Sequence, residues 1–463
     1  MRRLGLFLIL ALSAWVGPGL AQPTGVSPVH VTIGAAVTAL NGPWRFHTGD
    51  DPRWADPAFD DTAWESVDLT PRPGAHDGDV GLSGYVPGWN ARGHRGYAGY
   101  AWYRLHVALT APAGAVLALS GPPLVDSAYQ IFFNGHPLGG SGRFAGATPV
   151  VYGAQPRMFA LPAGADGGVV AVRAWAGPGR VAGAPDAGGI HIAPAIGDQA
   201  AIHDRFLLQW RQTFLGYVVD LIPAILLGLL AIMAASLCAV DPADRAYAWM
   251  VGALLVTAAA RFNQVVMFWT QIEDGMTYNI VRRALIEPLA LGAWTMAWLE
   301  WFRIGRARRF AMAAFVLTAV YSLAFLLGGS WRPSAVPDAL GAATHAVIVW
   351  VRYGFVALFL LLAVLGAGRE RPRPRFDLVA MASVAAILFG PELSLLHVQE
   401  IWFPWGVGVS LSEYGCVVLT PFLFATMLGR LLEMTRSLRT RPAGAQPQAR
   451  AMAGSGQSAK GKN

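Results

Sequence analysis

Seven apolar segments follow one another in the second half of the chain, and each approaches or exceeds the roughly 20 residues that cross a bilayer as a helix. They are residues 214–240, 246–269, 278–302, 310–329, 340–366, 378–398 and 405–428. Only 14% of the 463 residues are charged, against about 25% in typical soluble domains. The sequence therefore predicts an all-α transmembrane bundle of seven helices over residues 214–430.

The arginines decide between seven spans and six. Pro391 and Glu392 interrupt the sixth segment, and a six-span chain would place its C-terminus outside. Cytoplasmic loops carry an excess of arginine and lysine. With the N-terminal half outside and seven spans, the inner loops and tail hold Arg245, Arg303, Arg306, Arg308, Arg309, Arg369, Arg371, Arg373, Arg375, Arg430, Arg436, Arg439 and Arg441. The outer loops hold only Arg332, with Arg282 just inside the outer end of the third span. This asymmetry favours seven spans and a cytoplasmic C-terminus.

The first 21 residues have the pattern of a signal peptide. Two arginines precede a short apolar core, and the small residues Gly19 and Ala21 stand before Gln22. Such a segment is too short and wrongly flanked for a lasting span. We expect cleavage after Ala21 and export of the residues that follow.

Residues 22–200 have the pattern of a β-sandwich. Short runs alternate apolar and polar residues between Gly, Pro and Asp, as half-buried strands do. The clearest runs are 100–109, 114–121, 129–135 and 168–175. Asn134-Gly135 after an apolar run predicts a hairpin, because a type I′ turn needs positive φ at both central residues.

Two further segments complete the predicted organisation. Residues 201–213 form a juxtamembrane linker, in which Phe206, Leu207, Trp210 and Phe214 share one helix face. Such a face suits an interfacial helix that transmits a tilt, although a passive anchor would have the same pattern. Residues 431–463 form a short cytoplasmic tail that buries too little apolar surface to fold and is expected to be mostly disordered.

Several segments of the N-terminal half resemble the galactose-binding-like jelly-roll domain at the start of family 2 glycoside hydrolases. They are LNGPWRFHTGDDPRWADPAFDDTAWESVDL (40–69), YAWYRLHVAL (100–109) and FFNGHPLG (132–139). A sandwich of this kind followed by seven spans resembles the bacterial seven-transmembrane receptors with diverse intracellular signalling modules. GWNARGHRGYAGYAWYR (88–104) is similar to the sandwich segment of those receptors. The resemblance implies a multi-domain membrane protein, an all-β jelly-roll sandwich followed by an all-α seven-helix transmembrane bundle.

The resemblance also implies a sensory role without catalysis. Receptors of that family usually continue into a histidine kinase, a diguanylate cyclase or a phosphatase, and the predicted tail has no room for one. We therefore expect a separate cytoplasmic signalling protein as partner. Glycoside hydrolysis needs two carboxylates about 5–10 Å apart on a rigid scaffold. In family 2 these belong to a barrel domain, whereas Asp60 and Asp61 are adjacent and point different ways, so an enzyme is not expected.

One Gly-rich loop of the sandwich is the candidate ligand site. It concentrates polar and aromatic groups, and binding residues are often found on loops held by a rigid scaffold. The candidates are Trp89, Asn90, His94, Arg95 and Tyr97. A solvated loop or a contact with the membrane domain explains the same residues. Of the other tryptophans, Trp44 and Trp102 are expected in the core, and Trp54 and Trp64 are expected to hold the entry loops.

Eight ionisable residues fall inside the predicted spans, where each costs free energy unless it is paired or faces water. They are Asp220, Arg261, Arg283, Glu287, His345, Arg352, Glu392 and Glu413. At 1.5 Å per residue, most lie at a similar depth of roughly 7–15 Å from the outer end, so we expect a polar cavity open to the periplasm and roofed by the sandwich. Interhelical ion pairs that fix the bundle are the alternative. Arg283 and Glu287 are four residues apart and are expected to pair on one helix face.

Taken together, the sequence predicts a sensory receptor of the bacterial inner membrane. The N-terminal domain would recognise a small molecule or carbohydrate in the periplasm, and the ligand would rearrange the helices. A transporter, or a lectin-like membrane protein, is the alternative. The aspartates at 50, 51, 60 and 61 fit no calcium loop, so no metal site and no cofactor are expected. Nucleic acid is not an expected partner, and a homodimer is left open.

Overall fold

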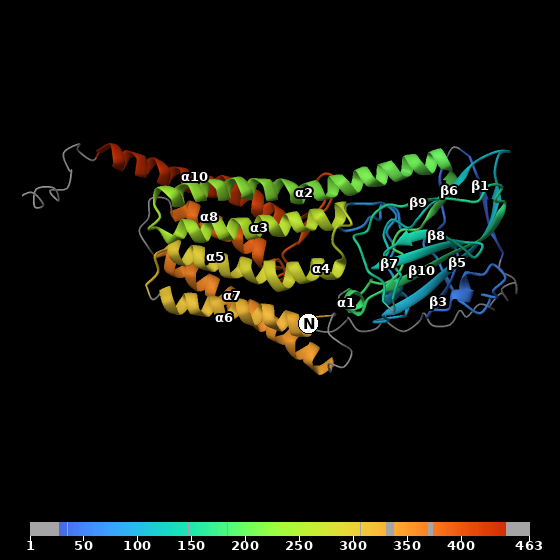
Figure 1. Ribbon diagram of the computed structural model, residues 1–463, viewed down its shortest axis with the longest axis horizontal. Helices are drawn as coiled ribbons and strands as arrows, with labels where there is room; N and C mark the ends of the chain where they lie inside the picture. Colours follow the sequence, from blue (N-terminus) through green and yellow to red (C-terminus); the bar gives the residue numbers. More distant parts are fainter. Residues whose placement is uncertain are drawn as a thin grey trace, which may run out of the picture.

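The computed structural model describes residues 27–440 except 35, 147, 183, 306, 330–337 and 369–373. Residues 27–198 form a β-sheet region, named here the β domain, and a helical domain begins at residue 199 (Figure 1). The predicted signal peptide and the chain beyond residue 440 lie outside the described residues. So do six of the arginines used to predict the topology, which are Arg306, Arg332, Arg369, Arg371, Arg373 and Arg441.

The β domain contains two sheets that share one hydrophobic core. The larger has the order β4 (Glu65–Val67), β3 (Trp44–Thr48), β5 (Gly99–Thr110), β10 (Gly167–Ala176), β7 (Ala128–Phe133) and β8 (His136–Ser141), with β1 (Val29–Thr32) parallel to β5. The smaller has the order β2 (Thr38–Ala39), β11 (Ala195–Asp198), β6 (Leu117–Ser120) and β9 (Met158–Ala160). Ile131 and Val172 of the larger sheet and Leu119 and Ile196 of the smaller one belong to the same buried cluster. The predicted strand runs are confirmed.

The predicted hairpin is also present. Asn134 and Gly135 join β7 to β8 with φ of 48° and 82°. Both values lie in the left-handed region that the tight turn requires, which glycine and asparagine adopt most readily. The Asn134 side chain then holds the turn against β10, because its Oδ1 accepts from Val169 N at 2.7 Å.

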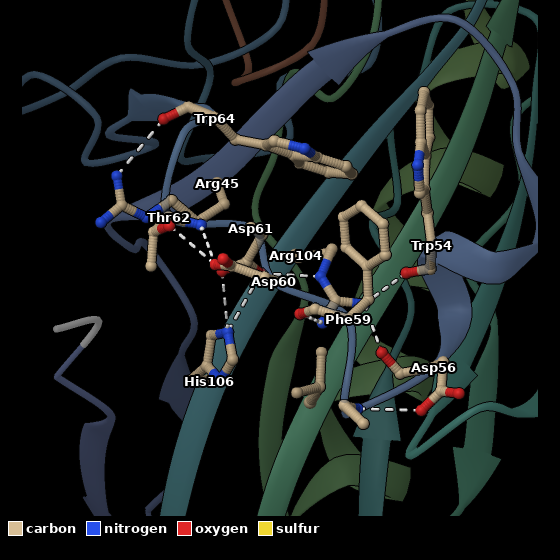
Figure 2. A network of polar contacts seen from close by, with 12 residues as sticks. Arg45, Trp54, Asp56, Phe59, Asp60, Asp61, Thr62, Trp64, Arg104 and His106 are labelled. Atoms are coloured by element: carbon tan, nitrogen blue, oxygen red, sulfur yellow. Dashed lines mark hydrogen bonds and ion pairs between the residues drawn. The ribbon is translucent and has the colours of Figure 1, made fainter.

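The tryptophan-rich entry segment is held by a buried arginine (Figure 2). Arg104 on β5 is fully buried, and its Nε donates to Asp61 Oδ2 at 2.7 Å. Its remaining guanidinium nitrogens donate to the carbonyl oxygens of Trp54, Asp56 and Phe59. Between β3 and β4 the regular structure is limited to a short 3-10 helix, η1 (Pro52–Ala55), and one cation satisfies a carboxylate and three carbonyls of this stretch.

The tryptophans of this segment pack inward. Trp44 and Trp102 are 0% and 1% exposed, and Trp64 is 8% exposed. Trp54 contacts both Trp64 and Trp102 edge to face. Trp44 and Trp102 lie in the core as predicted, and Trp54 packs with Trp64 against Trp102 at the entry segment.

The helical domain contains long helices and several short elements. Its bounds are α2 (Gln199–Val240), α3 (Arg245–Trp269), α4 (Gly275–Asn279), the π-helix η3 (Ile280–Ile286), α5 (Glu287–Trp301), α6 (Ala307–Gly328), α7 (Asp338–Ala367), α8 (Pro374–Leu388), α9 (Gly390–Ser394) and α10 (Leu411–Thr440). A small hairpin, β12 (Ile401–Trp402) with β13 (Val409–Ser410), precedes α10. Five helices in the described part of the chain, α2, α3, α6, α7 and α10, are long and apolar enough to cross a membrane.

The two remaining predicted spans are interrupted helices. The third is helical from α4 through η3 to α5, with the π-helix in its middle. The sixth ends as α8 at Leu388, and α9 starts after Phe389. Pro391 accounts for the second break, because proline lacks an N–H and restricts the residue before it. The seven-span prediction itself stays a prediction.

The helices are arranged as a closed ring. In the described residues, α3 packs on α2, and α5, α6, α7, α8 and α10 follow, each against its predecessor. The ring closes because α10 packs against both α8 and α2. One arc of the ring is thus α10, α2 and α3, and the facing arc is η3 with α6 and α7.

The linker predicted at 201–213 is not a separate element. Asp198, the last residue of β11, caps α2 by accepting from Ala200 N, and the helix then continues without a break to Val240. At 1.5 Å per residue the 42-residue helix is roughly 63 Å long, about twice the hydrocarbon thickness of a bilayer. Its first turns contact β6, β9 and β11, so α2 extends from the helical domain along the β domain (Figure 1).

Candidate functional site

A cavity of about 660 Å³ lies between the helices of the ring, and Gly78 and Asp79 of the β domain also line it. Seven of the eight ionisable residues predicted within the spans line it: Asp220, Arg261, Arg283, Glu287, His345, Arg352 and Glu413. The eighth, Glu392, contacts the lining residue Arg352. The similar depths counted along the separate segments therefore correspond to one place in the structure.

Arg261 on α3 joins three helices at the cavity wall. Its Nη1 lies 3.1 Å from Asp220 Oδ1 on α2 and 2.7 Å from Glu413 Oε1 on α10. The three side chains are 13%, 3% and 8% exposed. Glu413 also caps the start of its own helix by accepting from Ser410 N. One arginine thus faces two carboxylates, and its removal would leave both without a counter-charge.

The predicted pair between Arg283 and Glu287 is wrong. Glu287 is instead 3.5 Å from Arg282 Nε, while Arg283 is exposed. The π-helix explains the change, because an i to i+5 helix places a residue over its fifth neighbour and not its fourth. Tyr321 on α6 donates to the other oxygen of Glu287 at 2.8 Å. Arg282 also donates to Tyr278 one turn earlier.

Arg352 on α7 pairs with Glu392, a carboxylate of α9. Its Nε and Nη2 lie 2.5 and 2.7 Å from the two oxygens of Glu392, a bidentate arrangement, and Nη2 also donates to Leu388 O. Glu392 lies in the first turn of α9, directly after the break at Phe389. The break of the sixth predicted span therefore places a carboxylate beside Arg352.

Three lining groups keep free polar atoms. Arg283, His345 and Glu400 line the cavity and are exposed, and within the described residues their side chains form no hydrogen bond or ion pair. The other charged lining residues of the helices are paired. These three are thus the groups most available to a bound molecule.

The β domain forms part of the cavity wall. In the loop after residue 76, Asp77 accepts hydrogen bonds from the backbone N–H groups of Asp79 and Val80 and fixes the turn. Gly78 and Asp79 then line the cavity. Asp79 accepts from the hydroxyl of Tyr217 on α2, and its carbonyl accepts from Gly408 N at 2.7 Å. We name residues 76–82 the roof loop.

The roof loop is tightly fitted. A Cβ on Gly81 would lie 2.1 Å from Gly406 O, and one on Gly216 would lie 2.3 Å from Val80 Cγ1. Gln212 on α2 donates to the carbonyl oxygens of both Val80 and Gly406. The roof loop therefore contacts the hairpin through backbone atoms and α2 through the Gln212 and Val80 side chains, so a shift of one moves the others.

The carboxyl group of Asp79 has an altered proton affinity. The residue borders the cavity, but the protein around it desolvates the carboxyl group, and this raises its pKa to about 6 despite the hydrogen bond from Tyr217. The nearby carboxyl groups of Asp77 and Glu413 add to the effect, and Arg282 opposes it.

Sequence reasoning missed several lining residues. Asp79 and Glu400 lie outside the apolar segments, and Tyr321 carries no charge, so none of them met the criterion of an ionisable residue within a span. Arg282 was assigned to the outer end of the third span. Its position beside Arg283 was the one available signal for it.

The loop predicted to bind a ligand in the β domain is largely occupied by internal contacts. Trp89 is 1% exposed and donates to Tyr97 O, and Asn90 donates to the carbonyls of Val181 and Ala184. These two side chains are unavailable to a ligand in this conformation.

The remaining candidates of that loop lie nearer the surface. His94 Nε2 is 3.0 Å from Glu65 Oε2, Arg95 is exposed, and the hydroxyl of Tyr97 donates to Tyr100 O. A sugar site here stays a prediction. Among the described residues, no group of three or more His, Cys, Asp or Glu side chains could hold a metal ion.

No protein-family model matches the chain, and no curated protein matches it. Solved structures that match include a β-glucuronidase from Bacteroides uniformis, at 22% identity over 35% of this chain and 17% of that one, with a TM-score of 0.23. A β-glycosidase from Bacteroides vulgatus matches at 19% identity over 35% and 20%, also with a TM-score of 0.23. Bifidobacterium dentium β-glucuronidase complexed with coumarin-3-O-glucuronide matches at 17% identity over 32% and 22%, with a TM-score of 0.21. The chain spans about a fifth of the length of these proteins, and likeness at this level carries no activity to it.

Proposed function

We propose that this protein is a receptor of the bacterial inner membrane whose ligand binds in the cavity beneath the β domain. The ring of helices would cross the membrane seven times, with the β domain in the periplasm and the end of α10 in the cytoplasm. The five long apolar helices support the membrane location. The arginine distribution supports this orientation.

One observation carries the proposal: the cavity wall combines charged residues of the helices with Asp79 of the β domain. A molecule in the cavity would contact both at once. Its binding free energy would then differ between arrangements of the roof loop and of the helices, and such differential affinity is what shifts a conformational equilibrium.

At the opposite end of the ring, contacts between the start of α3 and the end of α10 could transmit the conformational change to a partner. Asp244 precedes α3 and lies 3.5 Å from Arg303 and 3.4 Å from Arg430 of α10. The guanidinium of Arg430 also lies 3.9 Å from the ring centre of Trp301. The Arg303 side chain is 75% exposed and that of Arg430 is 26% exposed. Partly exposed ion pairs contribute little to stability, so a small helix movement suffices to exchange these contacts for contacts with a cytoplasmic signalling protein.

The test compares two carboxylates of the same helix. A deletion strain would be complemented with the wild-type chain, with Glu413→Gln at the cavity, or with Glu433→Gln, which is exposed near the other end of α10. Membrane amounts would be matched by immunoblot, and transcripts would be compared between strains. The proposal predicts an altered transcript set for Glu413→Gln and a wild-type set for Glu433→Gln.

The transporter alternative gives a different result in the same strains. If the protein is a transporter, Glu413→Gln should abolish uptake of a substrate that the wild-type strain takes up. The transcripts of the two strains should then be the same as long as that substrate is absent from the medium. If Glu413→Gln at wild-type membrane level changes neither transcripts nor uptake, the paired charges only fix the bundle and the proposal is wrong.

A further inference from the structure

The cavity has two walls of opposite charge. One is the arc of α10, α2 and α3 with the roof loop and the hairpin, where the described lining residues include one arginine, Arg261, and four carboxyl groups. They are Asp79, Asp220, Glu400 and Glu413. Arg261 contacts Asp220 and Glu413, so this wall keeps an excess of negative charge. We name it the acidic wall.

The facing wall has the opposite excess. The arc of η3, α6 and α7 supplies three arginines and a histidine, which are Arg282, Arg283, Arg352 and His345. Among the described side chains two carboxylates accompany them, Glu287 beside Arg282 and Glu392 beside Arg352. We name it the basic wall.

The lining side chains without a hydrogen bond or ion pair among the described residues are divided between the two walls in the same way. On the basic wall Arg283 and His345 keep their donors free, and on the acidic wall Glu400 keeps its acceptors free. The π-helix produces the spare arginine, because it pairs Glu287 with Arg282 and leaves Arg283 without an ion pair among the described residues. An unpaired arginine in an apolar ring of helices is costly unless water or a ligand reaches it.

The size of the cavity suits a small molecule. About 660 Å³ falls within the 300–1,000 Å³ of typical ligand pockets. An anion alone would satisfy Arg283 and His345 but would leave the acidic wall uncompensated, and a cation alone would do the reverse. A molecule that carries both charges compensates both walls.

We propose that the ligand of this cavity is a small zwitterion, with its carboxylate or phosphate held by Arg283 and His345 and its ammonium held by Glu400 and Asp79. This inference rests on the proposed function, since it names the ligand class of the same cavity. The chemistry is shared by free zwitterions and by the headgroup of phosphatidylethanolamine, and the experiment separates the two sources.

The full chain in a non-ionic detergent would be titrated with β-alanine and phosphoethanolamine as zwitterions, succinate as a dianion and ethanolamine as a cation. Binding would be followed by thermal shift and calorimetry. The same chain in nanodiscs with and without phosphatidylethanolamine would be titrated in parallel. A zwitterion that binds in detergent and loses affinity when the lipid is present indicates a headgroup site. Equal affinity in both nanodiscs indicates a free ligand.

Three variants locate the site. Arg283→Gln and Glu400→Gln should each weaken zwitterion binding by at least about tenfold, which corresponds to about 1.4 kcal/mol. Arg308→Gln, exposed on α6, should bind as wild type. Succinate or ethanolamine binding as tightly as the zwitterions, or zwitterion binding that both cavity variants leave unchanged, overturns the inference.

The outcomes also separate this inference from the proposed function. If no zwitterion binds but Glu413→Gln still changes the transcripts, the ligand class is wrong and the receptor role stands. If zwitterions bind as expected while Glu413→Gln leaves transcripts unchanged, the ligand class stands and the receptor role is wrong.

Discussion

Asp79 of the β domain accepts a hydrogen bond from the hydroxyl of Tyr217 on α2, across 138 residues of sequence. The contact joins the roof of the cavity to the helix that extends from the β domain into the ring. Each partner is fixed on its own side, Asp79 by Asp77 through its backbone N–H and Tyr217 by stacking on Phe268, with ring centres 4.4 Å apart. A change at the roof is therefore passed directly to α2 and α3.

The first prediction concerns pH. The pKa of Asp79 is raised to about 6. The roof loop packed against α2 therefore binds the Asp79 proton more tightly than a roof loop released from α2 would. Docking is then favoured at low pH and weakens as the pH rises through about 6. The wild-type Tm should fall between about pH 5 and pH 8 relative to that of Asp79→Asn, whose amide still accepts from Tyr217.

A parallel pH profile for wild type and Asp79→Asn would contradict this account, because it would mean that Asp79 does not titrate in that range. Tyr217→Phe provides the matched control at the partner. It should keep the pH dependence, since the surrounding protein still desolvates the carboxyl group. It should also lower the Tm at all pH values, because the loss of one hydrogen bond reduces the free energy of unfolding by about 1 kcal/mol.

The second prediction concerns Arg261. Substitution by Met leaves Asp220 and Glu413 without a counter-charge in the ring, and breaking a buried ion pair in this way costs about 3–5 kcal/mol. Adding Asp220→Asn and Glu413→Gln to the same chain should recover most of the loss. Thermal unfolding in detergent measures both effects, and a triple variant no more stable than Arg261→Met would show that the charges do not form one unit.

The third prediction concerns the β domain. Arg104→Met removes the side chain that donates to Asp61 and to three carbonyl oxygens of the entry segment (Figure 2). Among the described residues, the Asp61 carboxylate then keeps only its contact with His106, at 3.0 Å. The expected loss is about 3–5 kcal/mol, with increased hydrogen exchange at residues 52–64. Arg53→Gln, at an exposed arginine of the same segment, should behave as wild type. Similar behaviour of the two variants would mean that the buried network does not hold the segment.

The fourth prediction concerns the far end of α10. Arg430→Gln removes the contacts of this helix with Asp244 and Trp301. Hydrogen exchange of residues 431–440 should increase, while global stability falls by less than about 1 kcal/mol, the usual range for a partly exposed pair. Unchanged hydrogen exchange in residues 431–440 would show that the contacts of Arg430 do not hold the end of α10, and this site could then not transmit the conformational change.

Much of the fold follows from local pattern. The run at 129–135 and its Asn134-Gly135 turn predict β7, the hairpin and β8, because alternation and positive φ are local requirements. The long apolar helices follow from hydropathy alone. The shared depth of residues such as Asp220, Arg261 and Glu413 predicts that they meet, since helices of one bundle expose their polar groups at a common level.

The remainder depends on contacts that a single sequence does not show. Nothing local marks residues 280–286 as a π-helix, so the partner of Glu287 was predicted one residue too late in the chain. The roof loop contacts the hairpin through glycines and carbonyls, and Tyr217 and Gln212 of α2 reach it across more than 130 residues of sequence, so no local pattern marks these contacts. Trp89 and Asn90 look like recognition residues in a Gly-rich loop, and only the packing shows that they are used internally.

The most direct test of the account measures whether a ligand in the cavity moves the far end of the ring. Spin labels would be placed at positions 308 and 432, both exposed, in a chain with Cys238 and Cys416 replaced by serine. Pulsed dipolar spectroscopy in nanodiscs would compare distances with and without a saturating zwitterion identified by the titrations. The account predicts a shifted distance distribution that Arg283→Gln abolishes. An identical distribution in the presence of demonstrably bound ligand would contradict it.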